Sequence, residues 1–115
     1  MSIQSYFRFL QLVSLIEHIK PRIALDKIEI LFLDRIALAI SQNVDLLVKD
    51  LISLSAIGSL ATLHNRLKSL EVRGYIRLIT DDADKRKKHV VLTTKARKYY
   101  ENLSRLIDQK GLIRK

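Results

Sequence analysis

The sequence has no cysteine and no tryptophan, and its 115 residues include only one proline, three glycines and three histidines. Without cysteine, disulfides, thiolate metal sites and thiol-based oxidation sensing are excluded. The histidines His18, His64 and His89 fall on different predicted elements without ligand-like spacing, so we expect no zinc site. Because glycine and proline are the poorest helix formers, their scarcity favours a mostly helical fold.

Long apolar runs and the usual enzyme motifs are also absent. Arg8, Glu17 and Lys20 interrupt the N-terminal apolar residues before they could span a bilayer, and no signal-peptide pattern precedes them. There is no glycine-rich phosphate loop, recognisable Ser/His/Asp set or calcium-hand pattern. We therefore expect no membrane association, no enzymatic activity and no cofactor or metal, with a cytoplasmic, nucleoid-associated location.

The charge balance points to a polyanionic partner. The net charge is +9 and the pI is near 10.0, while 48% of the residues are hydrophobic. The apolar content is enough for a packed core, and the length suits one domain covering residues 1–115. An excess of positive charge in so small a domain favours nucleic acid over a merely soluble basic protein.

Two helices are predicted in the first part of the chain. Residues 2–20 form a helix that is apolar over well over half of its surface, which indicates either a subunit interface or a central core helix. Residues 25–41 form a second helix after Pro21. Asn43 or Asp45 is expected to cap the next helix. The second helix is expected to turn five charged residues toward water, namely Asp26, Lys27, Glu29, Asp34 and Arg35.

Residues 45–93 have the pattern of a helix-turn-helix followed by a basic hairpin. A short helix over residues 46–52 and a turn over 53–58 precede a second helix over 59–73, with Ser59 as its N-cap and Gly74 as its left-handed C-terminal residue. Helical spacing predicts one inward stripe from Leu60, Leu63, Leu67 and Leu70.

Two strand-like runs, residues 75–80 and 89–93, flank a loop with three acids and then four cations. Asp84 is expected to brace this loop through an ion pair with Arg86. From Thr93 or Thr94 a last helix follows, whose apolar face is expected to pack on the first helix and complete a dimer. Residues 108–115 are expected to be a short frayed tail.

The side chains of the second helix and the hairpin tip suit double-stranded DNA. Asn pairs with adenine, Arg pairs with guanine and a Thr methyl contacts thymine, while cations at a hairpin tip can contact the backbone or enter the minor groove. The alternatives to DNA binding are an ordinary solvent-exposed helix face and a charged hairpin tip that only increases solubility. The candidate DNA-binding residues are Ser59, Thr62, His64, Asn65, Arg66, Lys68, Ser69, Arg73, Lys85, Arg86, Lys87 and Lys88.

An ordered set of short motifs resembles the MarR/SarA family of winged-helix transcriptional regulators. The set covers the second half of the chain, whereas the first half matches in helix layout only. Ala96 stands where the family often has Gly, and Ile52 stands where a small Ala is usual. The matching residues are Leu63, Leu67 and Leu70 with Glu71, Gly74, Tyr75 and Ile76, then Asp84 and Arg86, then Val91, Leu92 and Thr93.

The resemblance implies a mainly α winged helix-turn-helix fold with a small β-hairpin wing. It implies a homodimer joined through residues 1–20 and 94–115, with helix 59–73 in the major groove and the wing tip, residues 81–88, at the minor groove of an operator. Ser59, Thr62, His64, Asn65 and Arg66 would then enter the major groove, and Arg86 the minor groove.

The function implied is that of a sequence-specific transcriptional regulator, most simply a repressor. A small-molecule effector is possible but not indicated, because the chain is short for the ligand-responsive branch and lacks cysteine. Two alternatives stay open at this point. The chain could be a DNA-binding protein of replication or of plasmid or phage maintenance, or a winged helix used for protein-protein assembly.

Overall fold

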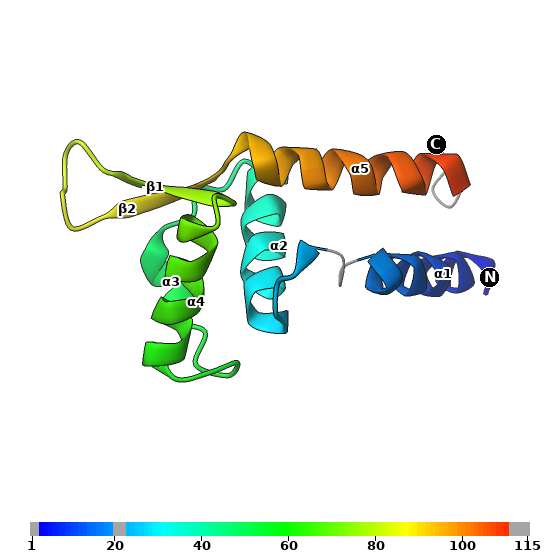
Figure 1. Ribbon diagram of the computed structural model, residues 1–115, viewed down its shortest axis with the longest axis horizontal. Helices are drawn as coiled ribbons and strands as arrows, with labels where there is room; N and C mark the ends of the chain where they lie inside the picture. The colour runs from blue at the N-terminus through cyan, green and yellow to red at the C-terminus, as the bar shows by residue number, and fades with distance from the viewer. Residues whose placement is uncertain (1–2, 20–22, 111–115) are drawn as a thin grey trace. The chain divides into compact units, whose positions relative to one another are not determined.

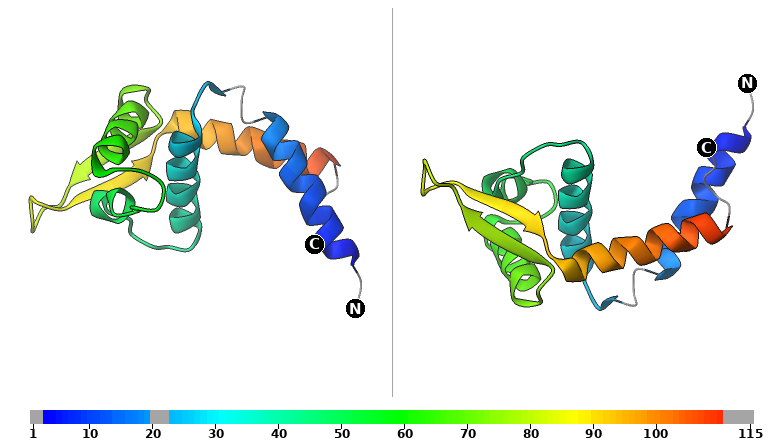
Figure 2. Two further views of the ribbon diagram at one scale, coloured as in Figure 1. Left: turned by 90° about the horizontal axis from the view of Figure 1, so that it is seen from below. Right: turned by 90° about the horizontal axis from the view of Figure 1, so that it is seen from above.

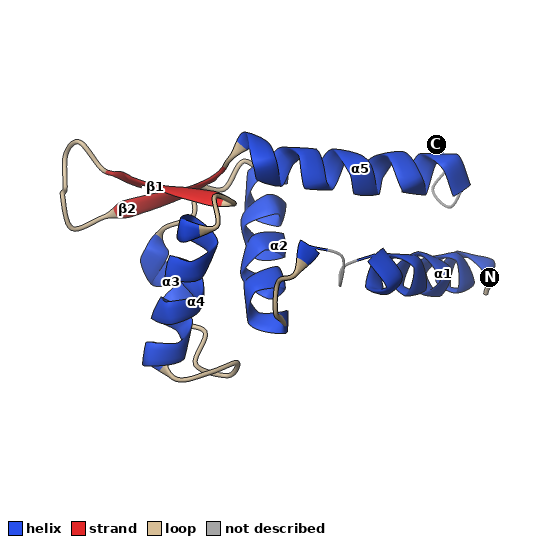
Figure 3. Ribbon diagram, in the orientation of Figure 1, coloured by secondary structure: helices blue, strands red, loops and turns tan. Residues whose placement is uncertain are grey.

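The structure is a computed structural model that describes residues 3–19 and 23–110. These residues form helices and one antiparallel hairpin, as the sequence predicted (Figures 1 and 3). The chain divides into two compact units, Asp26–Arg97 and the two terminal segments Met1–Leu25 and Lys98–Lys115. The elements in order are α1 (Gln4–Ile19), α2 (Lys27–Ser41), α3 (Val48–Ile52), α4 (Leu60–Val72), β1 (Ile76–Thr80), β2 (Lys88–Leu92) and α5 (Thr94–Lys110).

The unit Asp26–Arg97 has a core formed by α2, α3, α4 and the hairpin. Helix α4 packs on α2, α3 and β1, while the far end of the hairpin extends away from the helices (Figure 2). Burying large apolar side chains is the main favourable contribution to such packing. The largest fully buried side chains are Phe32, Leu33, Ile36, Leu51, Leu63, Leu70 and Ile76.

Helix α2 begins two residues later than predicted, because Asp26 acts as its N-cap. The Asp26 carboxylate accepts a hydrogen bond from the Glu29 backbone N–H at 2.8 Å, and the Glu29 carboxylate accepts one from the Asp26 N–H at 3.0 Å. This reciprocal pair satisfies two of the free amides at the helix start. The predicted polar turn ends the helix, and Asn43 takes a positive φ of 57° there, which Asn tolerates better than most residues.

The start of α3 differs from the sequence prediction. Neither Asn43 nor Asp45 caps it: the Asp50 carboxylate accepts a hydrogen bond from the Leu47 N–H at 2.9 Å. Asp45 instead bonds to His89 on β2. The capping prediction is therefore wrong for both residues, and the partner of Asp45 lies 44 positions away in the chain.

The terminal unit corrects two further predictions. The central-core interpretation of the first helix is wrong, because no side chain from residues 4–18 is buried. Phe9 is 51% exposed and Tyr6 is 62% exposed. Helix α5 has Tyr99 and Leu103 buried as predicted and continues to Lys110, so residues 108–110 are helical rather than part of a frayed tail. Residues 2 and 20 of the predicted first helix, and residues 111–115 of the tail, lie outside the described residues.

Two predictions of side-chain burial are also wrong. Leu60 is 59% exposed, so it does not belong to the inward stripe of Leu63, Leu67 and Leu70. Side chains of a helix tilt toward its N-terminus, so a residue in the first turn can project beyond the helix end. Glu29, expected to face water, is only 4% exposed because it has partners on α4.

The leucines of α4 provide a matched test of this assignment. Leu63→Ala removes a fully buried side chain, and we expect a loss of about 2–5 kcal/mol in the free energy of unfolding. Leu60→Ala, the control, should stay within about 0.5 kcal/mol of the parent. Urea unfolding followed by circular dichroism measures both. Equal losses for the two variants would contradict the observed burial.

Candidate nucleic-acid interface

Helix α4 has a well-defined start and end. The Ser59 hydroxyl accepts a hydrogen bond from the Thr62 N–H at 3.2 Å and donates one to the Thr62 hydroxyl at 3.0 Å. At the other end, Gly74 has a φ of +83°, and the Tyr75 N–H bonds to the Leu70 carbonyl at 3.0 Å. Only glycine adopts that backbone conformation without strain. Both predicted end residues are confirmed.

One side of α4 is exposed along its whole length. The buried side holds Leu63, Leu67 and Leu70, so α4 is fixed to the unit along one stripe. The opposite side combines an amide, a cation and an imidazole with apolar groups. We call this the free face of α4, and its exposed residues are Ala61, His64, Asn65, Lys68 and Val72.

A third side of α4 faces α2 and carries three of the predicted DNA-contacting residues. The Ser69 hydroxyl donates to the buried carboxylate of Glu29 at 2.7 Å, and the Arg73 Nε lies 3.9 Å from the same carboxylate.

Toward the start of α4, Arg66 forms an ion pair with Asp26, the N-cap of α2. Two acids of α2 therefore hold the polar flank of α4. Ser69 and Arg73 are bonded within the unit rather than standing on the free face.

The wing consists of β1, β2 and the loop 81–87 between them. Ile76 pairs with Leu92 and Thr80 with Lys88, so the predicted strands are confirmed within one residue at each end. Asp81 shapes the loop by accepting hydrogen bonds from the backbone N–H groups of Ala83 at 3.0 Å and Asp84 at 2.8 Å.

Arg86 stands at the outer end of this loop. Its side chain is 92% exposed and its Nε lies 3.2 Å from Asp84, which confirms the predicted brace. The backbone N–H of Arg86 also donates to the Asp84 carboxylate at 3.0 Å. These bonds from Arg86 lower the pKa of Asp84 below its ordinary value. Lys85 and Lys87 are exposed in the same loop, and Lys88 is exposed at the start of β2. The four predicted cations therefore follow one another at the loop end of the wing.

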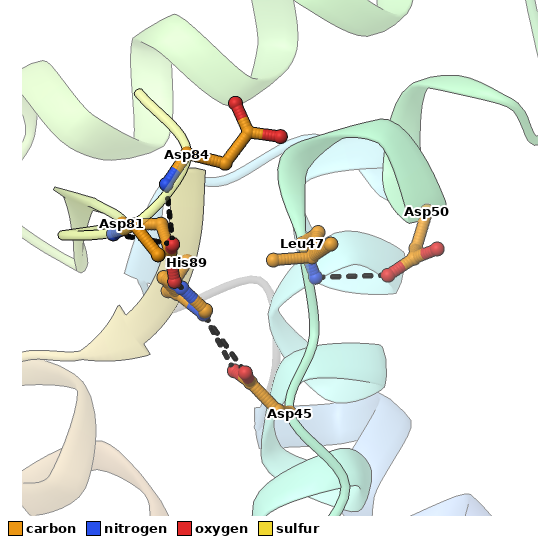
Figure 4. Close-up of polar contacts among 7 residues, drawn as sticks. Asp45, Leu47, Asp50, Asp81, Asp84 and His89 are labelled. Carbon is orange, nitrogen blue, oxygen red and sulfur yellow. Dashed lines mark hydrogen bonds and ion pairs between the residues drawn. The ribbon is translucent and has the colours of Figure 1, made fainter. Parts of the chain in front are cut away.

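His89, one position from the loop end of β2, joins the wing to the segment before α3. Its Nε2 lies 2.8 Å from an Asp81 carboxylate oxygen and its Nδ1 lies 2.9 Å from an Asp45 carboxylate oxygen (Figure 4). The hydrogen bond to Asp81, and then that to Asp45, raises the pKa of His89 above its ordinary value. The bond from His89 in turn lowers the pKa of Asp81.

The other end of the hairpin is fixed to the end of α4. The Thr93 hydroxyl donates to the Gly74 carbonyl at 2.5 Å, and the Thr93 N–H donates to the Tyr75 carbonyl at 3.1 Å. The Lys95 ammonium bonds to the Arg73 carbonyl at 2.8 Å and lies 4.5 Å from the centre of the Tyr75 ring. A cation near a helix C-terminus and over an aromatic ring is favourable on both counts.

Between α4 and the wing lies an open groove of about 360 Å³. Its wall on the α4 side includes His64 and Lys68, and its wall on the wing side includes Lys88. The free face of α4 and the two strands of the wing thus belong to one unit and border one groove. Glu71 and apolar side chains also line this groove. Its exposed cations, Lys68 and Lys88, suit a polyanion.

Sequence reasoning missed four residues that organise this surface: Asp26, Glu29, Asp45 and Asp81. Each has a partner on another element, and no local pattern reveals that contact. The reciprocal capping bonds of Asp26 with Glu29 and the bonds of Asp81 within its loop are local, and a pattern of neighbouring residues could have indicated them. His89 was noted only as a histidine without ligand-like spacing. Within the described residues, no group of histidines and acids is arranged to hold a metal ion, and no helix is long and apolar enough to cross a membrane.

The helix-turn-helix, the free face and the anchored wing define a winged helix-turn-helix of the kind found in DNA-binding proteins. No protein-family model matches the chain, and no curated protein matches it in sequence. Solved structures do match in fold, and they are MarR-type regulators. The chain therefore has the MarR-type winged helix-turn-helix fold that its motifs resemble.

Three of these structures illustrate the likeness. A mutant of Staphylococcus aureus MepR bound to an oligodeoxyribonucleotide is 20% identical, with 96% of this chain and 80% of that chain covered and a TM-score of 0.68. Heme-bound PefR from Streptococcus agalactiae is 22% identical, covering 95% and 78%, with a TM-score of 0.53. The adhesin competence repressor AdcR from Streptococcus pyogenes is 19% identical, covering 87% and 72%, with a TM-score of 0.54.

The buried carboxylate of Glu29 supplies a testable prediction. Glu29→Ala leaves the Ser69 hydroxyl and the Asp26 N–H without their acceptor, so we expect a loss of about 1–3 kcal/mol in unfolding free energy. Glu71→Ala is the matched control, because Glu71 lies on α4 and its ion pair with Lys68 is long, at 3.6 Å, and it should cost less than about 1 kcal/mol. Chemical denaturation compares the two, and equal stability would argue against a structural role for Glu29.

Proposed function

We propose that this chain binds double-stranded DNA sequence-specifically, as a homodimeric transcriptional regulator and most simply as a repressor. The observation that carries the proposal is the pairing, in one compact unit, of an exposed polar helix face with a cationic wing. The structural likeness to MepR bound to an oligodeoxyribonucleotide supports this use of the fold. The function is binding, without a catalytic step.

Helix α4 is proposed to enter the major groove with its free face toward the bases. Asn65 supplies a side-chain amide that can pair with both polar edge atoms of an adenine. His64 and Lys68 flank it and are exposed, so they can reach a base edge or a phosphate. Thr62 and the amides near Ser59 lie at the N-terminus of α4, where a phosphate is favoured.

For the three polar residues of α4 that face α2, we propose a mainly structural role. Arg66, Ser69 and Arg73 were predicted to contact DNA, and all three have acidic partners on α2. We propose that they mainly fix how α4 is presented. Arg73, whose side chain is 47% exposed, keeps enough accessible surface to contact a backbone phosphate.

The wing is proposed to contact the DNA backbone and minor groove. Arg86 is the most suitable residue for the minor groove, because its side chain is almost fully exposed while its backbone is held by Asp84. Arg side chains are favoured where the minor groove is narrow. Lys85, Lys87 and Lys88 supply further cations for phosphates.

The dimer is proposed to form through the terminal helices. Helix α1 has no buried side chain among residues 4–18, although it carries Tyr6, Phe7, Phe9 and Leu10. Apolar groups this exposed on one helix are typical of an interface between subunits. A two-fold dimer also gives a palindromic operator two equivalent winged units.

Fluorescence anisotropy on a duplex from upstream of the protein's own gene tests the proposal, with a scrambled duplex as competitor at several salt concentrations. We expect a preference for the upstream duplex that survives added salt, and a dimer in sedimentation equilibrium. Equal binding that collapses with salt would indicate backbone affinity only, and would favour the maintenance role over regulation. Binding to neither duplex would contradict the proposal and favour protein-protein assembly.

Replacement of Arg86 tests the wing. Arg86→Ala should weaken binding about tenfold or more and lower the salt dependence, because one cation–DNA contact is lost. Arg35→Ala removes the same charge from the exposed surface of α2 and should bind as the parent does. Anisotropy titrations at two salt concentrations measure both effects. If the two variants bind alike, the wing does not contact DNA.

Replacement of Asn65 tests base reading by α4. Asn65→Ala should lose about 1–3 kcal/mol of discrimination at one base pair in each half-site, while other positions keep their preference. Binding to a set of duplexes with single base-pair changes measures this. A uniform loss on every duplex would mean that Asn65 contacts a phosphate instead.

A further inference from the structure

His89 connects two acidic residues from different segments of the unit Asp26–Arg97. Its Nδ1 faces Asp45, in the segment between α2 and α3, and its Nε2 faces Asp81, at the start of the wing loop (Figure 4). The two distances, 2.9 and 2.8 Å, are both those of direct hydrogen bonds. The imidazole therefore joins the wing to the segment that leads into α3.

This arrangement requires a particular protonation state. An ionised carboxylate only accepts hydrogen bonds, and a neutral imidazole has one N–H donor, whereas the imidazolium has two. Both bonds can form together only when His89 carries the extra proton. When that proton leaves, one ring nitrogen turns a lone pair toward a carboxylate oxygen, and that contact becomes repulsive.

The surrounding charges favour the protonated form. Asp81 and Asp45 raise the pKa of His89 above 6.5, and the pKa of Asp81 is lowered, so Asp81 stays ionised while His89 titrates. A backbone hydrogen bond lies beside these side chains: the Val90 N–H donates to the Leu46 carbonyl at 3.0 Å. Other charged groups lie on the elements that pack against β2. They are Lys27, Glu29, Asp34 and Arg35 of α2, Lys49 and Asp50 of α3, Arg77 of β1, Asp82, Asp84, Lys85, Arg86 and Lys87 of the loop, and Lys88 of β2 itself.

The bonds continue from His89 to the outer end of the wing. The second carboxylate oxygen of Asp81 accepts from the N–H groups of Ala83 and Asp84. Asp84 then holds both the backbone and the guanidinium of Arg86. On the other side, Asp45 immediately precedes the residues that begin α3, where Asp50 caps Leu47. A continuous path of polar contacts thus runs from Asp45, in the segment before α3, to Arg86.

We propose that His89 is a proton-dependent positioning residue for DNA binding: in its protonated form it ties the wing to the start of α3 and sets where Arg86 meets the DNA. This inference rests on the proposed function, because the positioned cation is a DNA contact. His89 itself does not touch DNA; it acts through Asp81 and Asp84.

The direction of the pH dependence follows from the raised pKa of His89. The tie is complete below the ordinary value of 6.5 and is lost as the pH rises through the higher pKa of the folded protein. DNA affinity should therefore fall as the pH rises past the raised pKa that His89 has in the free folded protein. Linkage limits the fall to about a tenfold weakening per pH unit for each proton involved.

The test measures DNA affinity against pH for the full chain and three variants. His89→Gln is neutral at every pH, and Asp45→Asn keeps an acceptor oxygen but removes one charge. Arg35→Ala is the control, because Arg35 lies exposed on α2 and outside the proposed DNA-binding and dimer surfaces. His64 is present in all four proteins, so any contribution it makes is common to them. In parallel, NMR follows the His89 ring nitrogens and the backbone amides of Ala83, Asp84 and Arg86 in the free protein.

We expect the parent and Arg35→Ala to show the same fall in affinity, His89→Gln to lack it, and Asp45→Asn to shift it to lower pH. In the free protein the wing amides should titrate together with the His89 ring. An unchanged pH profile in His89→Gln, or wing amides that do not follow the His89 titration, would overturn the inference. If DNA binding is absent at every pH, the proposed function fails, and the free-protein titration alone decides whether His89 positions the wing.

Discussion

The packing of α4 against α2 is the constraint on which the rest of the unit depends. Leu63, Leu67 and Leu70 must be buried, and since they lie on one stripe of a helix, the opposite face is left in solvent. That face presents His64, Asn65 and Lys68. The same burial that stabilises the fold therefore determines which side chains are available for a partner.

Acidic residues complete the arrangement, although the partner proposed for this surface is itself an anion. Asp26 and Glu29 hold the flank of α4, Asp84 holds Arg86, and Asp45 with Asp81 holds His89. Each acid orients a cation or a donor before any ligand is present. Preorganised contacts reduce the ordering that binding must otherwise bring about. The net charge of +9 then supplies the attraction, while the acids fix the geometry.

The local elements were largely predictable from the sequence, because the signals for them lie within a few residues of one another. Ser59 and Gly74 bound α4 through contacts with their immediate neighbours, and the brace between Asp84 and Arg86 spans two positions. The prediction failed where the deciding contact is distant in sequence. Glu29 was expected in solvent because its partner Ser69 lies 40 positions away, and Asp45 was expected to cap a helix rather than to bind His89.

The sequence by itself determined the helical and hairpin elements, the apolar stripe of α4 and the cationic loop, because periodicity, capping residues and charge are properties of neighbouring positions. Only the tertiary structure decided which polar side chains of α4 stay free, and that His89 joins the wing to the start of α3. Those outcomes depend on side chains that folding brings within hydrogen-bond distance, and a linear pattern carries no record of such pairs. For the exposed apolar side of α1, sequence and structure each contributed. Its composition suggested an interface, and the structure removed the alternative of a core helix, because no side chain among residues 4–18 is buried.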